Sequence, residues 1–289
     1  KIWIRALRVH QWVKNLLIFV PIITAQLIND THSWIIATYA FIAFSLTASS
    51  FYVINDLIDL ADDRQHPSKK FRPFASGNLP ILHGIISIPI LLSIAALICI
   101  ILPLGFKKAL IGYCFLSLAY SLILKRIVLV DVFVLAGLYT WRLLAGTLVL
   151  EINYSLWLLS FSVFLFLSLA MVKRVTELIE ITSKFGKNSL SGRDYQSKDI
   201  EFLTAMGVAA GYTSILIFSL YIQGESQRFS QPTILWLSGL SLLFWISRIW
   251  LLTHRGQMDF DPIVFALRDV FSLLILIFCG LCFLIASYA

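Results

Sequence analysis

The stretch of sequence that decides the fold is residues 34–64, which read WIIATYAFIAFSLTASSFYVINDLIDLADDR. Its first part, residues 34–54, contains no charged side chain. About 20 apolar residues are enough for a helix to cross the hydrocarbon core of a bilayer. The stretch therefore predicts a transmembrane helix that leads directly into a group of carboxylates at one face of the membrane.

The composition of the whole chain agrees with this prediction. Of 289 residues, 59% are apolar and 13% are charged, and the mean hydropathy is +0.86. Soluble domains are about 45–50% apolar and about 25% charged, so the composition excludes a soluble enzyme. All four cysteines lie inside apolar runs, which favours packing over a disulfide framework or a metal site.

Nine apolar runs have about the length of a membrane span: 15–29, 34–54, 80–102, 109–124, 127–150, 154–172, 200–222, 232–253 and 263–288. We expect an all-α, polytopic membrane protein in which residues 1–289 form one transmembrane domain. About nine transmembrane helices would surround a polar cavity that faces the cytoplasm. Because the first and fourth runs are short, eight or ten spans also agree with the sequence.

Basic residues are distributed unevenly over the connections between these runs. Seventeen of the 23 Lys and Arg residues fall in connections on one side, whereas only Lys107, Lys108 and Arg228 fall on the other. Cytoplasmic loops of membrane proteins are enriched in Lys and Arg. We therefore expect a multi-pass protein of the cell inner (plasma) membrane, with its N-terminus and active site on the cytoplasmic side.

Three aspartates follow the run 34–54 at helical spacing. Asp56, Asp59 and Asp63 stand at i, i+3 and i+7 and share one face if the helix continues. Like charges on one face repel, and a helix C-terminus disfavours carboxylates. A divalent cation removes both penalties, and Mg²⁺ suits oxygen ligands beside substrate phosphates. We predict that these aspartates are the catalytic metal ligands, with Asn55 as a neighbouring substrate contact; a solvated acidic helix end is the alternative.

A basic segment follows the aspartates. Residues 64–77 read RQHPSKKFRPFASG, in which two prolines and a glycine favour a rigid turn. The side chains that we expect to bind phosphate oxygens are Arg64, Lys69, Lys70 and Arg72. Metal-binding carboxylates beside phosphate-binding cations predict a metal-complexed diphosphate as the substrate.

These motifs resemble those of the UbiA superfamily of intramembrane prenyltransferases. The spacing Asn55-Asp56-x-x-Asp59-x-x-x-Asp63 is similar to the first signature of that superfamily. Resemblance to its decaprenyl-phosphate phosphoribosyltransferase branch rests on the continuation to Gly77 and on four more motifs: Leu7-Arg8-x-x-Gln11-Trp12-Val13-Lys14-Asn15, Lys173-Arg174-x-x-Glu177-Leu178, Asp194-Tyr195-x-Ser197 and Ala266-Leu267-Arg268-Asp269. The resemblance extends from about residue 5 to residue 288.

The resemblance implies an Mg²⁺-dependent transferase of cell-envelope biosynthesis. It would move the 5-phosphoribosyl group of 5-phosphoribose 1-diphosphate to a polyprenyl phosphate and release diphosphate. Relatives that act on aromatic rings are expected to carry a second aspartate-rich motif, where this chain has Lys173 and Arg174. Cations at that place suit a substrate with more phosphate groups.

The remaining predicted substrate contacts lie in two places. Glu177 and Tyr195 belong to a predicted connection over residues 173–199, and Gln11, Lys14 and Asn15 precede or begin the first apolar run. A surface salt bridge between Lys173 and Glu177, four residues apart, is the alternative for Glu177. Asp131 and Arg142 lie in one apolar run about 17 Å apart along a helix, so we do not expect them to pair.

Two other functions also agree with part of the sequence. One is prenyl transfer from a polyprenyl diphosphate to an aromatic acceptor, for which Asp194 and Asp199 have the wrong spacing. The other is transport of phosphorylated solutes, although no internal repeat typical of transporters is visible. Besides the two substrates we expect membrane lipid and no nucleic acid as partners. The sequence leaves open a homo-oligomer and a phosphatase-like domain before Lys1.

Overall fold

A computed structural model describes residues 2–65, 69–185, 193–259 and 261–288. Every element in these ranges is a helix, as predicted. By internal contacts the chain divides into two compact units: unit 1 is Lys1–Ile22, Leu27–Ser121 and Arg142–Ile152, and unit 2 is Ile23–Gln26, Leu122–Trp141 and Asn153–Ala289. A single transmembrane domain over residues 1–289 stays a prediction.

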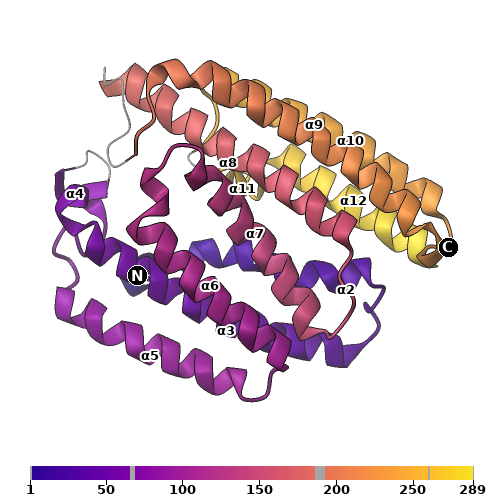
Figure 1. Ribbon diagram of the computed structural model, residues 1–289, viewed down its shortest axis with the longest axis horizontal. Helices are drawn as coiled ribbons and strands as arrows, with labels where there is room; N and C mark the ends of the chain where they lie inside the picture. Colours follow the sequence, from indigo (N-terminus) through magenta and orange to yellow (C-terminus); the bar gives the residue numbers. More distant parts are fainter. Residues whose placement is uncertain (1, 66–68, 186–192, 260, 289) are drawn as a thin grey trace. The chain divides into compact units, whose positions relative to one another are not determined.

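Unit 1 is built around the long helix α3 (Thr31–Ile58), which packs against α5 (Ile81–Cys99) and against the 3₁₀ helix η1 (Val9–Phe19) (Figure 1). The Asp30 carboxylate accepts hydrogen bonds from the first backbone N–H groups of α3 and so fixes its start. The other elements are α1 (Ile2–Ala6), α4 (Leu60–Gln65), η2 (Lys69–Phe71), α6 (Leu104–Leu122), the start of α2 (Val20–Thr24) and the end of α7 (Val130–Val149).

A small buried core holds the segment after η2 against the two main helices of unit 1. Phe74 is 1% exposed and packs with Ala6, Val53 and Leu79. Its ring lies so close to Gly84 of α5 that a Cβ atom there would come within 2.7 Å of it. This anchoring places the neighbouring Arg72 at the end of α3.

Unit 2 is a bundle of four long helices, α8 (Leu156–Phe185), α9 (Ile200–Gly224), α10 (Leu235–His254) and α12 (Val270–Tyr288) (Figure 1). The closest packing joins α8 to α9, where Ser168 donates a hydrogen bond to the carbonyl of Gly207 at 2.7 Å. Small residues let transmembrane helices approach in this way. The unit also contains the first part of α7 and the short elements η3 (Leu124–Arg126), η4 (Ser197–Asp199), η5 (Ser226–Arg228), η6 (Pro232–Ile234) and α11 (Pro262–Ala266).

The predicted apolar runs correspond to helices throughout the described residues. Seven helices are long and apolar enough to cross a membrane: α3, α5, α7, α8, α9, α10 and α12, the last over Val270–Ser287. The two runs that were short in the sequence correspond to α6 and to the shorter apolar stretch Val9–Thr24. The chain is a multi-pass membrane protein, and a count of nine spans is approximate.

The helix expected over 34–54 continues to Ile58, and Asp59, with φ −86° and ψ 10°, separates α3 from α4. Two predicted boundaries are wrong. The connection predicted over 173–199 begins later, because α8 continues to Phe185 and carries Lys173, Arg174 and Glu177 on a helix. The last run is divided by a break between α11 and α12. His66, Pro67 and Ser68 of the basic segment lie outside the described residues.

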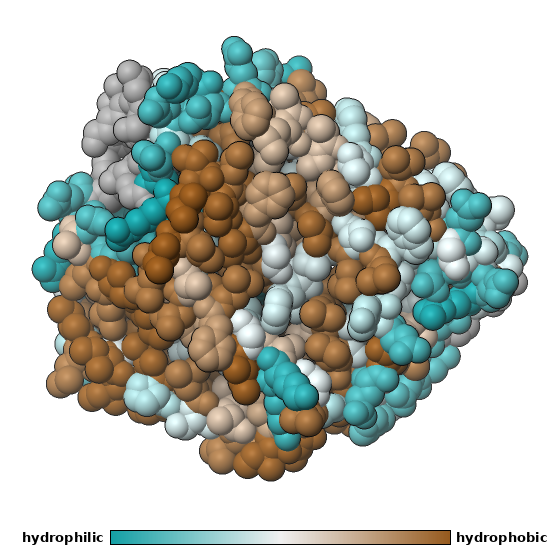
Figure 2. Space-filling view, viewed as in Figure 1, coloured by the Kyte–Doolittle hydropathy of each residue, from teal (hydrophilic) through white to brown (hydrophobic). Residues whose placement is uncertain are grey.

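Large apolar side chains are exposed along α5, α6 and α12. On α5 they include Leu82, Ile90 and Leu97, each at least half exposed. Figure 2 shows apolar residues over the face on which α5 lies, with hydrophilic residues gathered at the edges. Such surfaces suit contact with lipid, as expected for a membrane protein.

Candidate active site

Two of the three predicted aspartates meet in unit 1. Arg72 donates hydrogen bonds from one terminal nitrogen to Asp56 at 3.1 Å and to Asp63 at 2.6 Å. Arg8 forms a second ion pair with Asp56. Both carboxylates are 3% exposed, whereas the Arg8 and Arg72 side chains are 23% and 26% exposed. We call these four residues the aspartate cluster.

Local structure brings the members of the aspartate cluster together. The backbone N–H of Asp63 donates to the carbonyl of Asp59 at 2.8 Å, so helical spacing survives the break and the predicted i, i+7 relation of Asp56 and Asp63 is confirmed. Arg8 has a left-handed backbone with φ 48°, a conformation that costs energy for a residue with a side chain. Its guanidinium lies 5.0 Å from the centre of the Tyr52 ring.

Burial dominates the electrostatics of Asp63. It raises the pKa of the Asp63 carboxyl above its ordinary value; the charge and hydrogen bond of Arg72 lower it, the charge of Asp56 raises it, and that of Lys69 lowers it. Two buried carboxylates that share one guanidinium are costly unless a cation stays with them. A nearby cation therefore stabilises the ionised form of this site.

The donor set of the aspartate cluster fits a magnesium ion. Since Asp56 and Asp63 both reach one nitrogen of Arg72, a cation at that nitrogen's place would contact two carboxylates. Mg²⁺ is usually bound by one or two carboxylates and completes its shell with water and substrate phosphates. No group of three or more His, Cys, Asp or Glu side chains suited to a metal occurs in the described residues. Asp59 as a third ligand stays a prediction.

The other predicted contacts of unit 1 differ in exposure. Asn55, Asp59, Lys69 and Gln11 are half-buried, whereas Arg64 and Lys70 are exposed, and Lys70 lies 5.2 Å from the centre of the Phe71 ring. Lys14 is 6% exposed. The turn predicted for this basic segment is present between Lys69 and Leu79, with Gly77 at φ 75°.

Asn15 takes part in a buried hydrogen-bond network. It is 1% exposed, donates to Ser45 at 2.8 Å and accepts from Arg142 at 2.8 Å. Arg142 also donates to Tyr113 at 3.2 Å. Because both polar ends of its side chain have protein partners, Asn15 is suited to position Arg142. Its role as a substrate contact stays a prediction.

A second set of charged residues lies in unit 2. The Arg174 guanidinium is paired with Asp131 of α7 at 2.7 Å and with Glu177 one helical turn further along α8. Arg193 lies 3.3 Å from Glu177 and 3.7 Å from Asp131. Tyr195 donates to Asp131, accepts from the backbone N–H of Leu129 at 2.8 Å, and places its ring 5.6 Å from the Arg174 guanidinium. We call Asp131, Arg174, Glu177, Arg193 and Tyr195 the arginine cluster.

The arginine cluster changes how the predicted contacts of unit 2 are interpreted. Glu177 pairs with Arg174 and Arg193. The alternative for Glu177 was a surface salt bridge with Lys173, and it did not predict these two ion pairs. Arg174 is fully buried and Tyr195 is 1% exposed, while Lys173 is half-buried. Asp131 pairs with Arg174 and Arg193, and Arg142 donates to Asn15 and Tyr113, so each has partners other than those considered in the sequence.

Three charged residues of the two clusters were not among the predicted site residues: Arg8, Asp131 and Arg193. Arg8 stood inside a motif of the resemblance, but Gln11, Lys14 and Asn15 were the members of that motif predicted to contact substrate. Asp131 gave a signal as an ionisable residue in an apolar run, which is expensive unless it is paired. Its partners come from residues more than 40 positions away, and no local pattern reveals such a pair.

Comparison with known proteins agrees with this fold. The family model described as "UbiA prenyltransferase family" matches residues 17–259. A solved UbiA homologue from Archaeoglobus fulgidus, bound to GPP and Mg²⁺, has a TM-score of 0.75 at 14% identity and covers 98% of this chain and 99% of that one. At this identity the likeness shows the fold alone.

Three sequence relatives show how the chain compares with curated proteins. It is 38% identical over 272 residues to "Uncharacterized protein y4nM" of Sinorhizobium fredii, covering 93% of this chain and 52% of that protein. It is 34% identical over 273 residues to "Nodulation protein NoeC" of Azorhizobium caulinodans, covering 93% and 87%. It is 31% identical over 237 residues to the decaprenyl-phosphate phosphoribosyltransferase of Corynebacterium glutamicum, covering 77% and 68%.

The helices of the described residues, seven of which could cross a membrane, and the family match together define the class, an intramembrane transferase. The chain belongs to the UbiA prenyltransferase family. Its resemblance to the decaprenyl-phosphate phosphoribosyltransferase branch is confirmed by the relative from Corynebacterium glutamicum. The chain spans about half the length of the Sinorhizobium relative.

Proposed function

We propose that the protein transfers the 5-phosphoribosyl group of 5-phosphoribose 1-diphosphate to a polyprenyl phosphate, in an Mg²⁺-dependent reaction that releases diphosphate. The aspartate cluster carries the proposal. Two buried carboxylates are held there by two partly exposed arginines, which is an arrangement suited to a metal-bound diphosphate. Relatives of 30–32% identity named decaprenyl-phosphate phosphoribosyltransferase support the choice of donor.

The chemistry requires a leaving diphosphate and a nucleophilic oxygen. The bond from the anomeric carbon of the ribose to the diphosphate oxygen breaks, and a bond from that carbon to a phosphate oxygen of the acceptor forms. A divalent metal supplies charge neutralisation for the departing diphosphate. Because the acceptor phosphate is already anionic at neutral pH, the reaction needs no strong general base.

Asp56 and Asp63 would hold the metal, with Asp59 as a predicted further ligand. Arg8 and Arg72 would then turn from these carboxylates to oxygens of the diphosphate, which accept charge-assisted hydrogen bonds equally well. Their partial exposure allows this exchange of partners without leaving a buried cation alone. Lys69, Lys70, Arg64, Asn55, Gln11 and Lys14 stay predicted substrate contacts in unit 1, as do Lys173, Arg174, Glu177 and Tyr195 in unit 2.

The excess of basic residues on one set of connections supports a location in the inner membrane with the active site toward the cytoplasm. A single cysteine placed at Ser197 should react with an impermeant thiol reagent only from the inner face, and one at Asn153 only from the outer face. Equal labelling of both positions from one side would contradict this orientation.

Two assays with the purified protein separate the proposed reaction from its alternative. In the first, radiolabelled 5-phosphoribose 1-diphosphate and a polyprenyl phosphate should give a labelled lipid product when Mg²⁺ is present. In the second, a polyprenyl diphosphate and hydroxybenzoate should give none. Product only in the second assay would favour prenyl transfer to an aromatic acceptor. Product in neither assay would contradict both phosphoribosyl transfer and prenyl transfer.

A further inference from the structure

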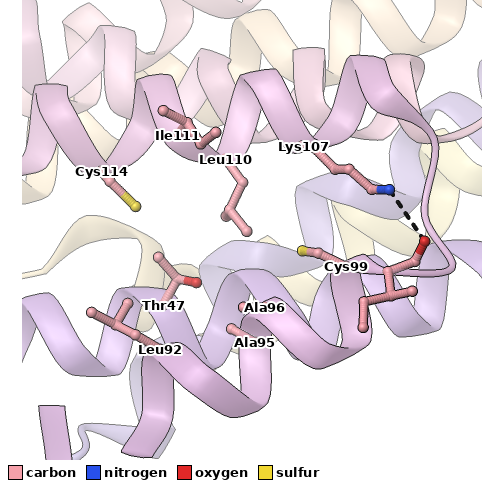
Figure 3. Close-up of a pocket in the computed structure, with 10 residues that line it drawn as sticks. Thr47, Leu92, Ala95, Ala96, Cys99, Lys107, Leu110, Ile111 and Cys114 are labelled. Atoms are coloured by element: carbon pink, nitrogen blue, oxygen red, sulfur yellow. Dashed lines mark hydrogen bonds between the residues drawn. The ribbon is translucent and has the colours of Figure 1, made fainter. Parts of the chain in front are cut away.

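A groove in unit 1 shares no lining residue with either cluster. It runs between α5 and α6, has a volume of about 360 Å³ and is lined almost entirely by apolar side chains (Figure 3). The small side chains Ala95 and Ala96 leave the hollow on α5, and Leu110 and Ile111 face it from α6. In a bilayer, hydrocarbon rather than water fills an apolar groove of this kind, since an empty one loses dispersion contacts along its lining.

A lysine stands at one end of the groove, and a second lysine follows it in the chain. Lys107 lines it and donates a hydrogen bond to the carbonyl of Ile100, just beyond the end of α5, at 3.1 Å. A cation at a helix C-terminus is favourable, and an ammonium group has two further N–H donors. This contact accounts for Lys107, whereas the neighbouring Lys108 is exposed.

The position of this pair conflicts with the charge pattern of the rest of the chain. Only three of 23 basic residues fall in connections predicted for the outer side, and Lys107 and Lys108 are two of them. Basic residues are avoided there in membrane proteins. Lys107 at the mouth of an apolar groove, with the exposed Lys108 next to it in the chain, complements a ligand with a hydrocarbon chain and an anionic head.

We propose that the groove binds one acyl chain of an anionic phospholipid, whose phosphate lies against Lys107 and Lys108. The chain occupies the space beside Ala95 and Ala96, and the two ammonium groups donate to phosphate oxygens, which are strong acceptors for charged donors. The site is independent of the proposed transfer reaction, because none of its residues belongs to the aspartate cluster or the arginine cluster.

Lipid retention by the purified full chain tests the charged end. Native mass spectrometry after mixing with dioleoyl phosphatidylglycerol or dioleoyl phosphatidylcholine should show preferential retention of the anionic lipid. The double variant Lys107→Ala/Lys108→Ala should weaken this retention about tenfold or more. Arg228→Ala, which removes the third basic residue predicted for that side, is the matched control and should change nothing. Equal retention of both lipids, or a double variant that behaves like the wild type, overturns the proposal.

Filling the groove tests its apolar part. Ala96→Phe should reduce retention of phosphatidylglycerol, whereas Ala209→Phe, at an equally exposed alanine of α9, should not. Bound lipid should also slow the reaction of Cys99 and Cys114 in the groove with a membrane-permeant maleimide, and leave Cys279 unaffected. If Ala96→Phe instead splits a dimer of this chain, the groove is an interface between copies and the proposal is wrong. If that variant does not fold, the lysine variants at the exposed mouth decide.

Discussion

The aspartate cluster of unit 1 and the arginine cluster of unit 2 contain the same charges but bury different members, although Arg193 and Glu177 of the arginine cluster are also partly exposed, at 20% and 17%. Each pairs two carboxylates with two guanidinium groups. In the aspartate cluster the carboxylates are buried, but Arg8 and Arg72 are about one quarter exposed. In the arginine cluster Asp131 and Arg174 are both 0% exposed. The two sites differ in which charges can leave their partners.

Partner exchange is easy in one cluster and costly in the other. Arg8 follows the short helix α1 and Arg72 follows the short helix η2. Both guanidinium groups are partly exposed, so they can bind another anion while a metal binds the carboxylates. Arg174 and Asp131 come from two long helices, and separating them removes one of the two ion-pair partners of each fully buried charge. The aspartate cluster is therefore suited to binding, and the arginine cluster to holding α7, α8 and the segment around Tyr195 in place.

The largest effect is expected from removing a carboxylate of the aspartate cluster. Asp56→Ala or Asp63→Ala should lower transfer about a thousandfold or more, because charge neutralisation by a metal contributes several kcal/mol to the transition state. Thermal unfolding should change little. EDTA should abolish transfer by the wild type, and Mg²⁺ should restore it. Near-normal turnover by either variant would remove the metal site and, with it, the proposed difference between the clusters.

Removing Asp131 should have the next largest effect, and on stability. Asp131→Ala leaves Arg174 buried without one of its two carboxylates, which costs about 3–5 kcal/mol for a broken buried pair. The expected result is a strongly lowered melting temperature in detergent, or loss of the folded monodisperse protein. Asp56→Ala, measured in the same way, is the control. An Asp131→Ala protein as stable as the wild type would show that the ion pairs of the arginine cluster can be broken as easily as those of the aspartate cluster.

The comparison also shows what the sequence could predict. The helical class, the apolar runs and the i, i+7 relation of Asp56 and Asp63 follow from local patterns, because hydrophobicity and helical spacing are properties of short segments. The bond from Arg72 to both aspartates agrees with a basic segment placed directly after them.

The rest depends on contacts between distant residues. Nothing near Asp131 indicates that Arg174 and Tyr195 will meet it, since they lie 43 and 64 positions further along the chain. The same holds for Arg8 and Asp56, 48 positions apart. Lys173 and Arg174 look alike in sequence, and only burial distinguishes them. A resemblance to a family names such residues as a group but does not separate positioning residues from those that touch substrate.

Variants of Lys173 and Arg174 can distinguish a residue that contacts substrate from one that positions its neighbours. If half-buried Lys173 binds a substrate phosphate, Lys173→Ala should raise the apparent KM for one substrate about ten- to hundredfold, which corresponds to a lost charge-assisted hydrogen bond of about 1.5–3 kcal/mol, with an unchanged melting temperature. Arg174→Ala should instead lower the melting temperature. Arg255→Ala, at an exposed position after α10, is the control for a lost surface charge. Identical behaviour of the Lys173 and Arg174 variants would contradict the distinction.

The smallest effect is expected at Tyr195, and it decides whether this side chain positions the arginine cluster or contacts substrate. Tyr195→Phe removes the hydroxyl that donates to Asp131 and accepts from the Leu129 N–H. Because buried polar groups then lack a partner, we expect a loss of about 1–3 kcal/mol in unfolding free energy and faster hydrogen exchange at the Leu129 amide. Tyr212→Phe, at a half-exposed tyrosine of α9 that bonds Ser247, should change stability by less than about 0.5 kcal/mol. A Tyr195→Phe protein with normal stability and normal exchange, but a raised KM, would show instead that the hydroxyl meets the substrate and that the arginine cluster is part of the binding site.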